Sequence, residues 1–247
     1  MARIKAVLFD VDGTLLDSND AHAHAWLDAL RGHGIDVPFD LVRSKIGKGG
    51  DKMLLEVAGI DSESPTGKLL SERRTAVFKA HYLADLGPVP GSRALVERLR
   101  SRGLACAVVT SAGSGELADL LRVAAVANLF DTKITSDDAN RSKPDPDLVE
   151  VALSKLGVGP REAVMIGDTP YDITAAARAG VSTIAFRSGG WKDRDLDGAI
   201  AIYDHGADLL ARLDQSPLAL GVNDDMPAAP ASRAGSRSRR RPALPGV

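Results

Sequence analysis

The sequence predicts an α/β fold in which a doubly wound, mainly parallel sheet carries an inserted, all-helical domain. Three observations predict it. Short, continuously apolar runs recur along the chain, helical stretches lie between them, and one long helical stretch without a strand follows the first run. Continuous apolar runs are typical of strands covered on both faces, as in a parallel sheet. Their alternation with helices favours a doubly wound core with right-handed crossovers.

The first predicted strand, "AVLFD", ends at Asp10, and the insertion follows it. The insertion contains four helical stretches with no strand between them: "AHAHAWLDALRGHG", "DLVRSKIG", "GGDKMLLEVAG" and "KLLSERRTAVFKAHYLADL". Proline and glycine interrupt the periodicity at its borders, "LLDS" and "GPVPGS", which are therefore candidate hinges. The predicted core comprises residues 1–15 and 89–215, and the helical cap comprises residues 16–88.

Helices and strands alternate after the insertion. Apolar residues at helical spacing, each series ending in glycine, predict helices over 92–103, 146–157 and 171–180. Three further strands are predicted from "ACAVVTS", "AVMIGD" and "STIAF", which end at Ser111, Asp168 and Phe186. From Ser216 onward the periodicity is lost and Pro, Ala, Ser and Arg dominate. This composition predicts a disordered tail over residues 216–247.

The composition excludes several classes of partner. The chain has 247 residues, of which 44% are hydrophobic and 26% charged, with a net charge of -2. These values predict neither a nucleic-acid surface nor a membrane surface. The tail is basic, with five arginines against two aspartates. The tail alone could contact nucleic acid or an acidic partner, or it is simply solvated.

Cysteine usage and the N-terminus suggest a compartment. The one cysteine, Cys106, lies inside the apolar run "LACAVV", so it is predicted to be buried and has no partner for an internal disulfide. A reducing cytoplasm fits this, and a cytoplasmic location is expected. The first apolar run is too short for a signal peptide, and no run approaches the ~18 residues of a membrane span. The sequence leaves monomer and dimer equally open.

Polar side chains gather where the predicted strands end, together with one lysine in the loop "RSKPDPD". They are Asp10, Asp12, Thr110, Ser111, Lys143, Asp168 and Asp172. Ligands of doubly wound sheets gather outside the carboxyl ends of the strands. Carboxylates there suit Mg²⁺, which also takes oxygens from a substrate phosphate. The cation would neutralise Asp10 and Asp168, so that Asp10 stays ionised and nucleophilic.

Four motifs in this set resemble those of a known family. "DVDGT", "VVTS", "SKPDPD" and "GDTPYD" are similar, in order and spacing, to motifs one to four of the haloacid dehalogenase-like (HAD) hydrolases, and the resemblance covers residues 6 to about 213. It implies a Rossmann-like core. The insertion resembles the C1 cap of the subgroup that includes phosphoglycolate phosphatase and β-phosphoglucomutase.

The resemblance implies roles for these residues. Asp10 would be the nucleophile that forms an aspartyl-phosphate, and Asp12 the general acid and base. Thr110 would bind the phosphoryl oxygens, with Ser111 contributing at least its backbone N–H, and Lys143 would offset negative charge. The metal ligands would be the Asp10 and Asp168 carboxylates and the Asp12 backbone carbonyl. Asp172 would orient this shell, directly or through water, unless it only caps its helix.

Asp12 must be protonated for part of the cycle in order to donate, and a neighbouring anion is expected to favour that form. Haloacid dehalogenases themselves lack this second acid, so its presence disfavours dehalogenation. His22 and Trp26 lie four residues apart on the first cap helix, where they either contact substrate or pack.

The predicted function is a Mg²⁺-dependent phosphatase that acts on a small phosphorylated metabolite. The alternative is a phosphosugar mutase of the β-phosphoglucomutase type, which returns the phosphoryl group to its substrate. A phosphonate hydrolase with a Schiff base on Lys48 or Lys52, or a catalytically silent sensor of a phosphate ligand, is less favoured. The sequence does not identify the substrate.

Overall fold

The computed structural model describes residues 3–219, and these contain a six-stranded parallel sheet in the order β3-β2-β1-β4-β5-β6. The strands are β1 (Ala6–Phe9), β2 (Ala105–Val109), β3 (Thr132–Ile134), β4 (Ala163–Gly167), β5 (Ser182–Phe186) and β6 (Ala201–Tyr203). Four of them are the predicted apolar runs. The predicted fold class is confirmed.

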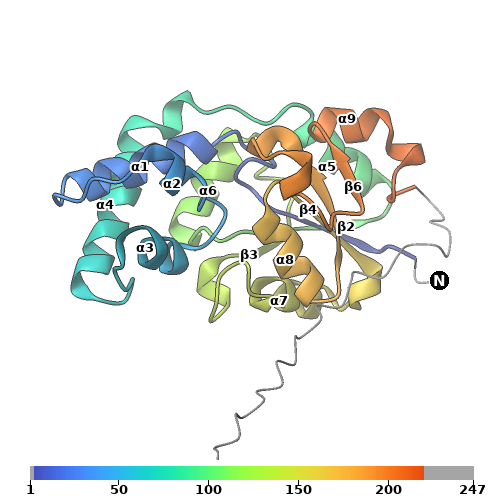
Figure 1. The fold of residues 1–247 in the computed structure, drawn as a ribbon. Helices are drawn as coiled ribbons and strands as arrows, with labels where there is room; N and C mark the ends of the chain where they lie inside the picture. Colours follow the sequence, from blue (N-terminus) through green and yellow to red (C-terminus); the bar gives the residue numbers. More distant parts are fainter. Residues whose placement is uncertain (1–2, 220–247) are drawn as a thin grey trace, which may run out of the picture.

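Helices cover both faces of the sheet (Figure 1). Val7 and Phe9 of β1 pack with α5 (Ser92–Ser101), α6 (Ser114–Val123) and α9 (Gly206–Ala211). The alternate residues of β1, Ala6 and Leu8, pack on the other face with α7 (Asp147–Leu156) and α8 (Pro170–Arg178). Every residue of β1 is therefore buried, which explains its continuously apolar sequence.

The order of the strands reverses at β1. β2 and β3 continue on one side of β1, whereas β4, β5 and β6 continue on the other. In such a sheet the crossovers leave on opposite faces at this point, and a crevice opens outside the carboxyl ends of the two central strands. Asp10 follows β1 and Asp168 follows β4, so the reversal brings these two carboxylates together.

The elements that the sequence did not predict are mostly short and peripheral. β3 and β6 have three residues each and form the two edges of the sheet, where one flank needs no apolar covering. Helices α6 and α9 were also not predicted. Short 3₁₀ helices connect the larger elements: η1 (Leu83–Asp85), η2 (Ser136–Asp138), η3 (Pro160–Glu162), η4 (Arg187–Gly189), η5 (Asp193–Asp195) and η6 (Leu213–Gln215).

The insertion between β1 and β2 is helical, as predicted. It contains α1 (Asn19–Arg31), α2 (Phe39–Arg43), α3 (Gly50–Ala58) and α4 (Pro65–His81), which lie together on one side of the sheet (Figure 1). These helices bury their own apolar cluster, which includes Trp26, Leu30, Met53, Leu54 and Leu70. The cap thus has a hydrophobic core separate from those of the sheet.

The two connections between cap and sheet run side by side. Leu16 and Pro88 form an antiparallel bridge, and Asp17 N–H donates to the Gly87 carbonyl at 3.0 Å. The two borders proposed as hinges are therefore hydrogen-bonded to each other.

The C-terminal end of the described chain packs on the sheet. Ser216 and Leu218, which the sequence assigns to the tail, are buried, and Leu218 joins the cluster under α5 and α9. The rest of the predicted tail, residues 220–247, lies outside the described residues. Cys106 is buried as predicted, and burial raises the pKa of its thiol to about 12.

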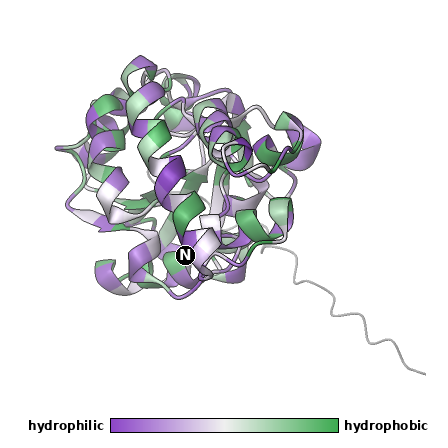
Figure 2. Cartoon of the chain, turned by 90° about the vertical axis from the view of Figure 1, so that its left-hand side faces the viewer, coloured by the Kyte–Doolittle hydropathy of each residue, from purple (hydrophilic) through white to green (hydrophobic). Residues whose placement is uncertain are grey.

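Within residues 3–219, none of the helices combines the length and the apolar character that a membrane crossing requires. Figure 2, seen from the side of the cap, shows hydrophilic and hydrophobic segments alternating along the helices. This is the pattern of helices with one buried face and one solvated face.

Candidate active site

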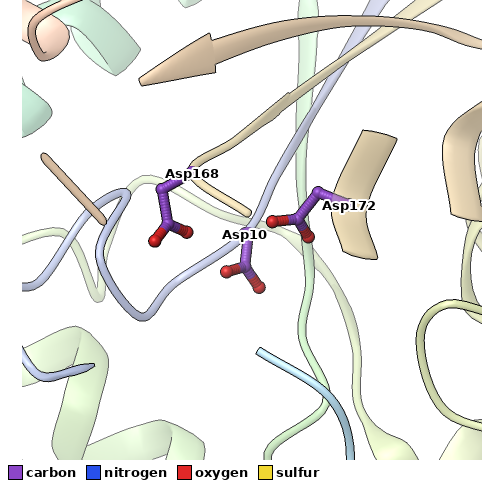
Figure 3. A group of neighbouring side chains, drawn as sticks. All are labelled: Asp10, Asp168 and Asp172. Atoms are coloured by element: carbon purple, nitrogen blue, oxygen red, sulfur yellow. The ribbon is translucent and has the colours of Figure 1, made fainter. Parts of the chain in front are cut away.

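Three buried aspartates form a cluster at the carboxyl ends of β1 and β4. One carboxylate oxygen from each of Asp10, Asp168 and Asp172 lies within 4.8 Å of the others. Figure 3 shows Asp10 between Asp168 and Asp172. Asp172 also caps α8, since its carboxylate accepts from the Thr169 N–H at 3.1 Å and hydroxyl at 2.7 Å. The sequence presented capping and membership of the cluster as alternatives, and the structure combines them.

Lys143 lies beneath this cluster and is completely buried. Its Nζ is 2.6 Å from Asp10 Oδ1 and 2.7 Å from Asp172 Oδ1, and it donates to the Val109 carbonyl at 2.9 Å. The loop before α7 therefore delivers the lysine to Asp10, where the sequence placed it. Burial alone would lower the pKa of Lys143, but the charges of Asp10 and Asp172 outweigh burial and raise it.

The cluster carries more negative charge than the described residues balance. Three carboxylates and one ammonium leave a formal surplus of two negative charges when all are ionised. Burial raises the pKa of Asp10 to about 8, although the charge of Lys143 opposes this. Burial also raises the pKa of Asp168 well above its usual range, and the negative charges of Asp172 and Asp10 add to this effect. A bound divalent cation would balance this surplus. The oxygen donors, their burial and their charge therefore fit a hard divalent metal ion.

Asp168 is also held by neutral groups that the sequence analysis did not single out. Thr14 Oγ1 donates to its Oδ1 at 3.2 Å, and Asn19 Nδ2 donates to its Oδ2 at 2.8 Å. A Cβ on Gly13, where φ is +73°, would lie 2.1 Å from Asp168 Oδ2, and one on Gly189 would lie 2.0 Å from it. Only glycine leaves room for the carboxylate at these two positions. No spacing rule in the sequence indicates such contacts.

Asp12 lies beside the cluster and contacts the cap. Its Oδ1 accepts a hydrogen bond from Ser18 Oγ at 2.5 Å and lies 2.8 Å from His22 Nε2. Burial would raise the pKa of Asp12, but the charge of His22 and the hydrogen bonds from His22 and Ser18 outweigh burial and lower it. The expectation that a neighbouring anion would favour protonated Asp12 is not met, because the partners of its carboxylate are His22 and Ser18.

His22 is thus a residue of the site, whereas the sequence left open whether it contacts substrate or only packs. The structure combines packing and contact, since its imidazole stacks on Phe78 with ring centres 4.1 Å apart while Nε2 faces Asp12. Its position one helical turn after Ser18 was the available signal, because residues four apart share a helix face.

Thr110 and Ser111 follow β2 and line the same cleft as Asp10 and Asp12. The buried Thr110 hydroxyl accepts from the Ala112 N–H at 3.1 Å, and Ser111 Oγ lies 3.5 Å from the Gly47 carbonyl of the cap. The cleft encloses about 470 Å³, including space open to solvent. The lining is completed by residues of the cap, of the loop after β2 and of α6: His22, Trp26, Ile46, Gly47, Lys48, Gly50, Arg74, Ala112 and Glu116.

The sequence profile of the haloacid dehalogenase-like hydrolase family matches residues 7–186, from β1 to β5. The chain belongs to this family. Its helical insertion after β1 places it with the C1-cap subgroup, and the protein is an enzyme of the hydrolase class. The resemblance expected from the four motifs is confirmed.

Two characterised relatives and one solved structure are similar over most of this HAD-like hydrolase. N-acetylmuramic acid 6-phosphate phosphatase of Pseudomonas aeruginosa is 32% identical over 87% of this chain and 96% of its own length. Validoxylamine A 7'-phosphate phosphatase of Streptomyces hygroscopicus subsp. limoneus is 32% identical over 72% of this chain and 83% of its own. A hydrolase from Pseudomonas syringae superposes with a TM-score of 0.80 at 31% identity, covering 85% of this chain and 98% of its own.

Proposed function

We propose that this HAD-like hydrolase is a Mg²⁺-dependent phosphatase that hydrolyses a small phosphorylated metabolite through an aspartyl-phosphate. The observation that carries the proposal is Asp10, a buried carboxylate that lines the cleft beside a second acid, Asp12. Lys143 lies 2.6 Å from it, and it belongs to a cluster of three carboxylates that could hold a divalent cation. Phosphoryl transfer depends mainly on positioning and on charge neutralisation, and this arrangement supports both. Relatives that act on phosphate esters support the reaction class.

In the first step an Asp10 carboxylate oxygen attacks phosphorus, the P–O bond to the leaving alcohol breaks, and that oxygen takes a proton from the Asp12–His22 pair. In the second step water attacks the phosphorus of the aspartyl-phosphate while Asp12 accepts its proton, and phosphate leaves with Asp10 restored. Lys143 orients the Asp10 carboxylate and offsets its charge. Thr110 and Ser111 line the cleft at the phosphoryl position.

The carboxylates of Asp10 and Asp168, with the backbone carbonyl of Asp12, would hold Mg²⁺, and Asp172 would complete or orient this shell. When bound, the ion offsets charge on the phosphoryl oxygens and on the aspartates. Thr14 and Asn19 orient the Asp168 carboxylate by donating to one of its oxygens each.

The phosphonate-hydrolase alternative loses support from the two cap lysines. A Schiff base requires an unprotonated amine that faces the substrate. Lys48 Nζ is paired with Glu56 at 2.5 Å, and Lys52 Nζ is paired with Asp145 at 2.6 Å outside the cleft lining. Both amines are thus engaged with carboxylates.

Phosphate release from a panel of phosphomonoesters, with Mg²⁺ or with a chelator, tests the proposal. We expect Mg²⁺-dependent release that Asp10→Asn abolishes and that Asp131→Asn, at an exposed surface aspartate, leaves intact. Interconversion of hexose phosphates without net release would support the mutase instead. If the Mg²⁺-loaded protein turns over no phosphate ester, the catalytically silent sensor is favoured instead.

The aspartyl-phosphate is tested with Asp12→Asn and p-nitrophenyl phosphate. Because nitrophenolate leaves without protonation, this variant should still phosphorylate Asp10 but hydrolyse the product slowly. We expect a burst of up to one nitrophenolate per enzyme, followed by slow turnover. A linear time course at the wild-type rate would contradict the role of Asp12 in hydrolysing the aspartyl-phosphate.

A further inference from the structure

The cleft also contains an ion pair between the cap and the sheet domain. Nη1 of Arg74, on α4, donates to both carboxylate oxygens of Glu116, on α6, at 2.8 and 2.9 Å. The Arg74 guanidinium carbon also lies 5.3 Å from the centre of the Trp26 ring. The side chain of Glu116 is only 6% exposed. Arg74 is therefore held between an aromatic ring and a buried carboxylate.

The other permanent cation of the cleft lining is also paired. Lys48 Nζ lies 2.5 Å from Glu56, and the same ammonium sits 4.8 Å from the centre of the Tyr171 ring. Apart from Lys48 and Arg74, the cap side of the lining as described contains the imidazole of His22, which faces Asp12, and otherwise uncharged residues. Each of these two cations of the lining thus has a carboxylate partner, and Glu56 is shared with Lys45, whose Nζ lies 3.0 Å from it.

We propose that the leaving group of the substrate is uncharged and rich in hydroxyl groups, as in a sugar or polyol phosphate, and that Glu116 selects against a second anionic group. This inference rests on the proposed phosphatase function and deepens it. It divides the phosphomonoesters into two classes. Esters of neutral polyols are accepted, whereas phosphocarboxylates, bisphosphates and pyrophosphate are disfavoured.

Neutral and anionic leaving groups would make different contacts with this ion pair. A hydroxyl both donates and accepts, so it can bond to the Glu116 carboxylate and to an Arg74 donor without separating them. Nε of Arg74 has no hydrogen-bond partner among the described residues, and only Nη1 contacts Glu116. A carboxylate or phosphate would accept from Arg74 but would also meet the charge of Glu116, whose side chain is only 6% exposed. Such like-charge contact is strongly unfavourable.

Matched pairs of phosphate esters test this directly with the Mg²⁺-loaded wild-type protein. One pair is 2-hydroxyethyl phosphate and 2-phosphoglycolate; the other is glycerol 3-phosphate and 3-phosphoglycerate. Within each pair a CH₂OH group replaces a carboxylate at the same place. We expect kcat/KM to be at least about tenfold higher for each hydroxyl member, as like-charge repulsion requires. Equal values, or a preference for the anionic members, would overturn the inference.

Variants then assign the selectivity to the ion pair. Glu116→Gln keeps the shape of the side chain and frees the Arg74 charge, so the preference for the hydroxyl member should fall by about tenfold or reverse. The double variant Glu116→Gln/Arg74→Gln should lose the improved turnover of the anionic member, because the Arg74 charge that Glu116→Gln frees is then also removed. Glu97→Gln, at an exposed glutamate of α5, serves as the control and should keep the wild-type ratio. An unchanged ratio in folded Glu116→Gln would contradict the role of Glu116.

Hydrolysis of p-nitrophenyl phosphate tests the phosphatase function separately from the proposed substrate class. Hydrolysis of that ester together with a preference for the anionic probes would overturn only the substrate class. If neither it nor any of the four probes is hydrolysed in the presence of Mg²⁺, the phosphatase function itself fails and the substrate class fails with it. If Glu116→Gln does not fold, the wild-type ratios alone still decide the substrate class.

Discussion

Asn19 connects the first turn of the cap to the aspartate cluster. Its Nδ2 donates to Asp168 at 2.8 Å, while its own Oδ1 is buried without a partner among the described residues. A buried amide oxygen of this kind lacks a hydrogen bond that a metal-bound water would supply. At the scale of single residues, Asn19 is therefore a positioning residue for the proposed Mg²⁺ site.

Replacing Asn19 by alanine should weaken Mg²⁺ binding by about 10- to 100-fold, because partners that orient a metal ligand contribute on this scale. Isothermal titration with Mg²⁺ measures this without reference to turnover. Asn128→Ala removes an asparagine that contacts only Arg93 on the surface, and it should bind Mg²⁺ like the wild type. If Asn19→Ala binds Mg²⁺ as tightly as the wild type, Asn19 is not needed to orient Asp168.

The protonation of Asp10 gives Mg²⁺ binding a definite pH dependence. Without metal the pKa of Asp10 is raised to about 8, mainly by burial, so at pH 6 the carboxyl holds a proton that Mg²⁺ must displace. Affinity should therefore rise between pH 6 and 8, by about tenfold per unit for each proton released. Titration in two buffers of different ionisation enthalpy measures the released protons. Binding that neither releases protons nor varies with pH would contradict a raised Asp10 pKa.

Patterns along single strands and helices predicted most of the elements but not the contacts between them. Four buried strands were recognisable because helices cover both of their faces, whereas the three-residue edge strands β3 and β6 left no such pattern. Asp10 and Asp168 were predictable because each follows an apolar run. Arg74 and Glu116 were not, because their pairing depends on how α4 of the cap lies against α6. Sequence spacing carries no information on that packing.

At the scale of elements, α3 offers adjacent leucines with opposite environments. Leu54 is fully buried in the cluster of the cap, and Leu55 is 58% exposed. Leu54→Ala should lower the free energy of unfolding by about 2–5 kcal/mol through lost burial and a cavity, whereas Leu55→Ala should change it by less than about 0.5 kcal/mol. Denaturant unfolding followed by circular dichroism compares the two. Similar losses in both variants would contradict the separate core of the cap.

The cap contacts the sheet domain at the loop that carries Lys143. Lys52, at the start of α3, pairs with Asp145 at 2.6 Å and donates to the Ser142 carbonyl, and Ser142 Oγ donates to Asp51 at 2.5 Å. These partners flank Lys143 on both sides in the sequence. At the scale of the whole molecule, the position of the cap is therefore coupled to the loop that places the lysine on Asp10.

Lys52→Met should loosen this contact without touching the cleft, because Lys52 is not among the residues that line it. The Lys52 side chain is one-quarter exposed, so the ion pair should contribute about 1 kcal/mol or less to holding the cap in place. Its removal should therefore lower kcat/KM by up to about fivefold. Wild-type kcat/KM should fall with added salt, which screens partly exposed pairs, and the variant should show a shallower fall. Lys68→Met, which removes an exposed cap lysine paired only with Glu63, should keep the wild-type salt profile. A salt profile in Lys52→Met identical to that of the wild type would show that this pair does not hold the cap closed over Asp10.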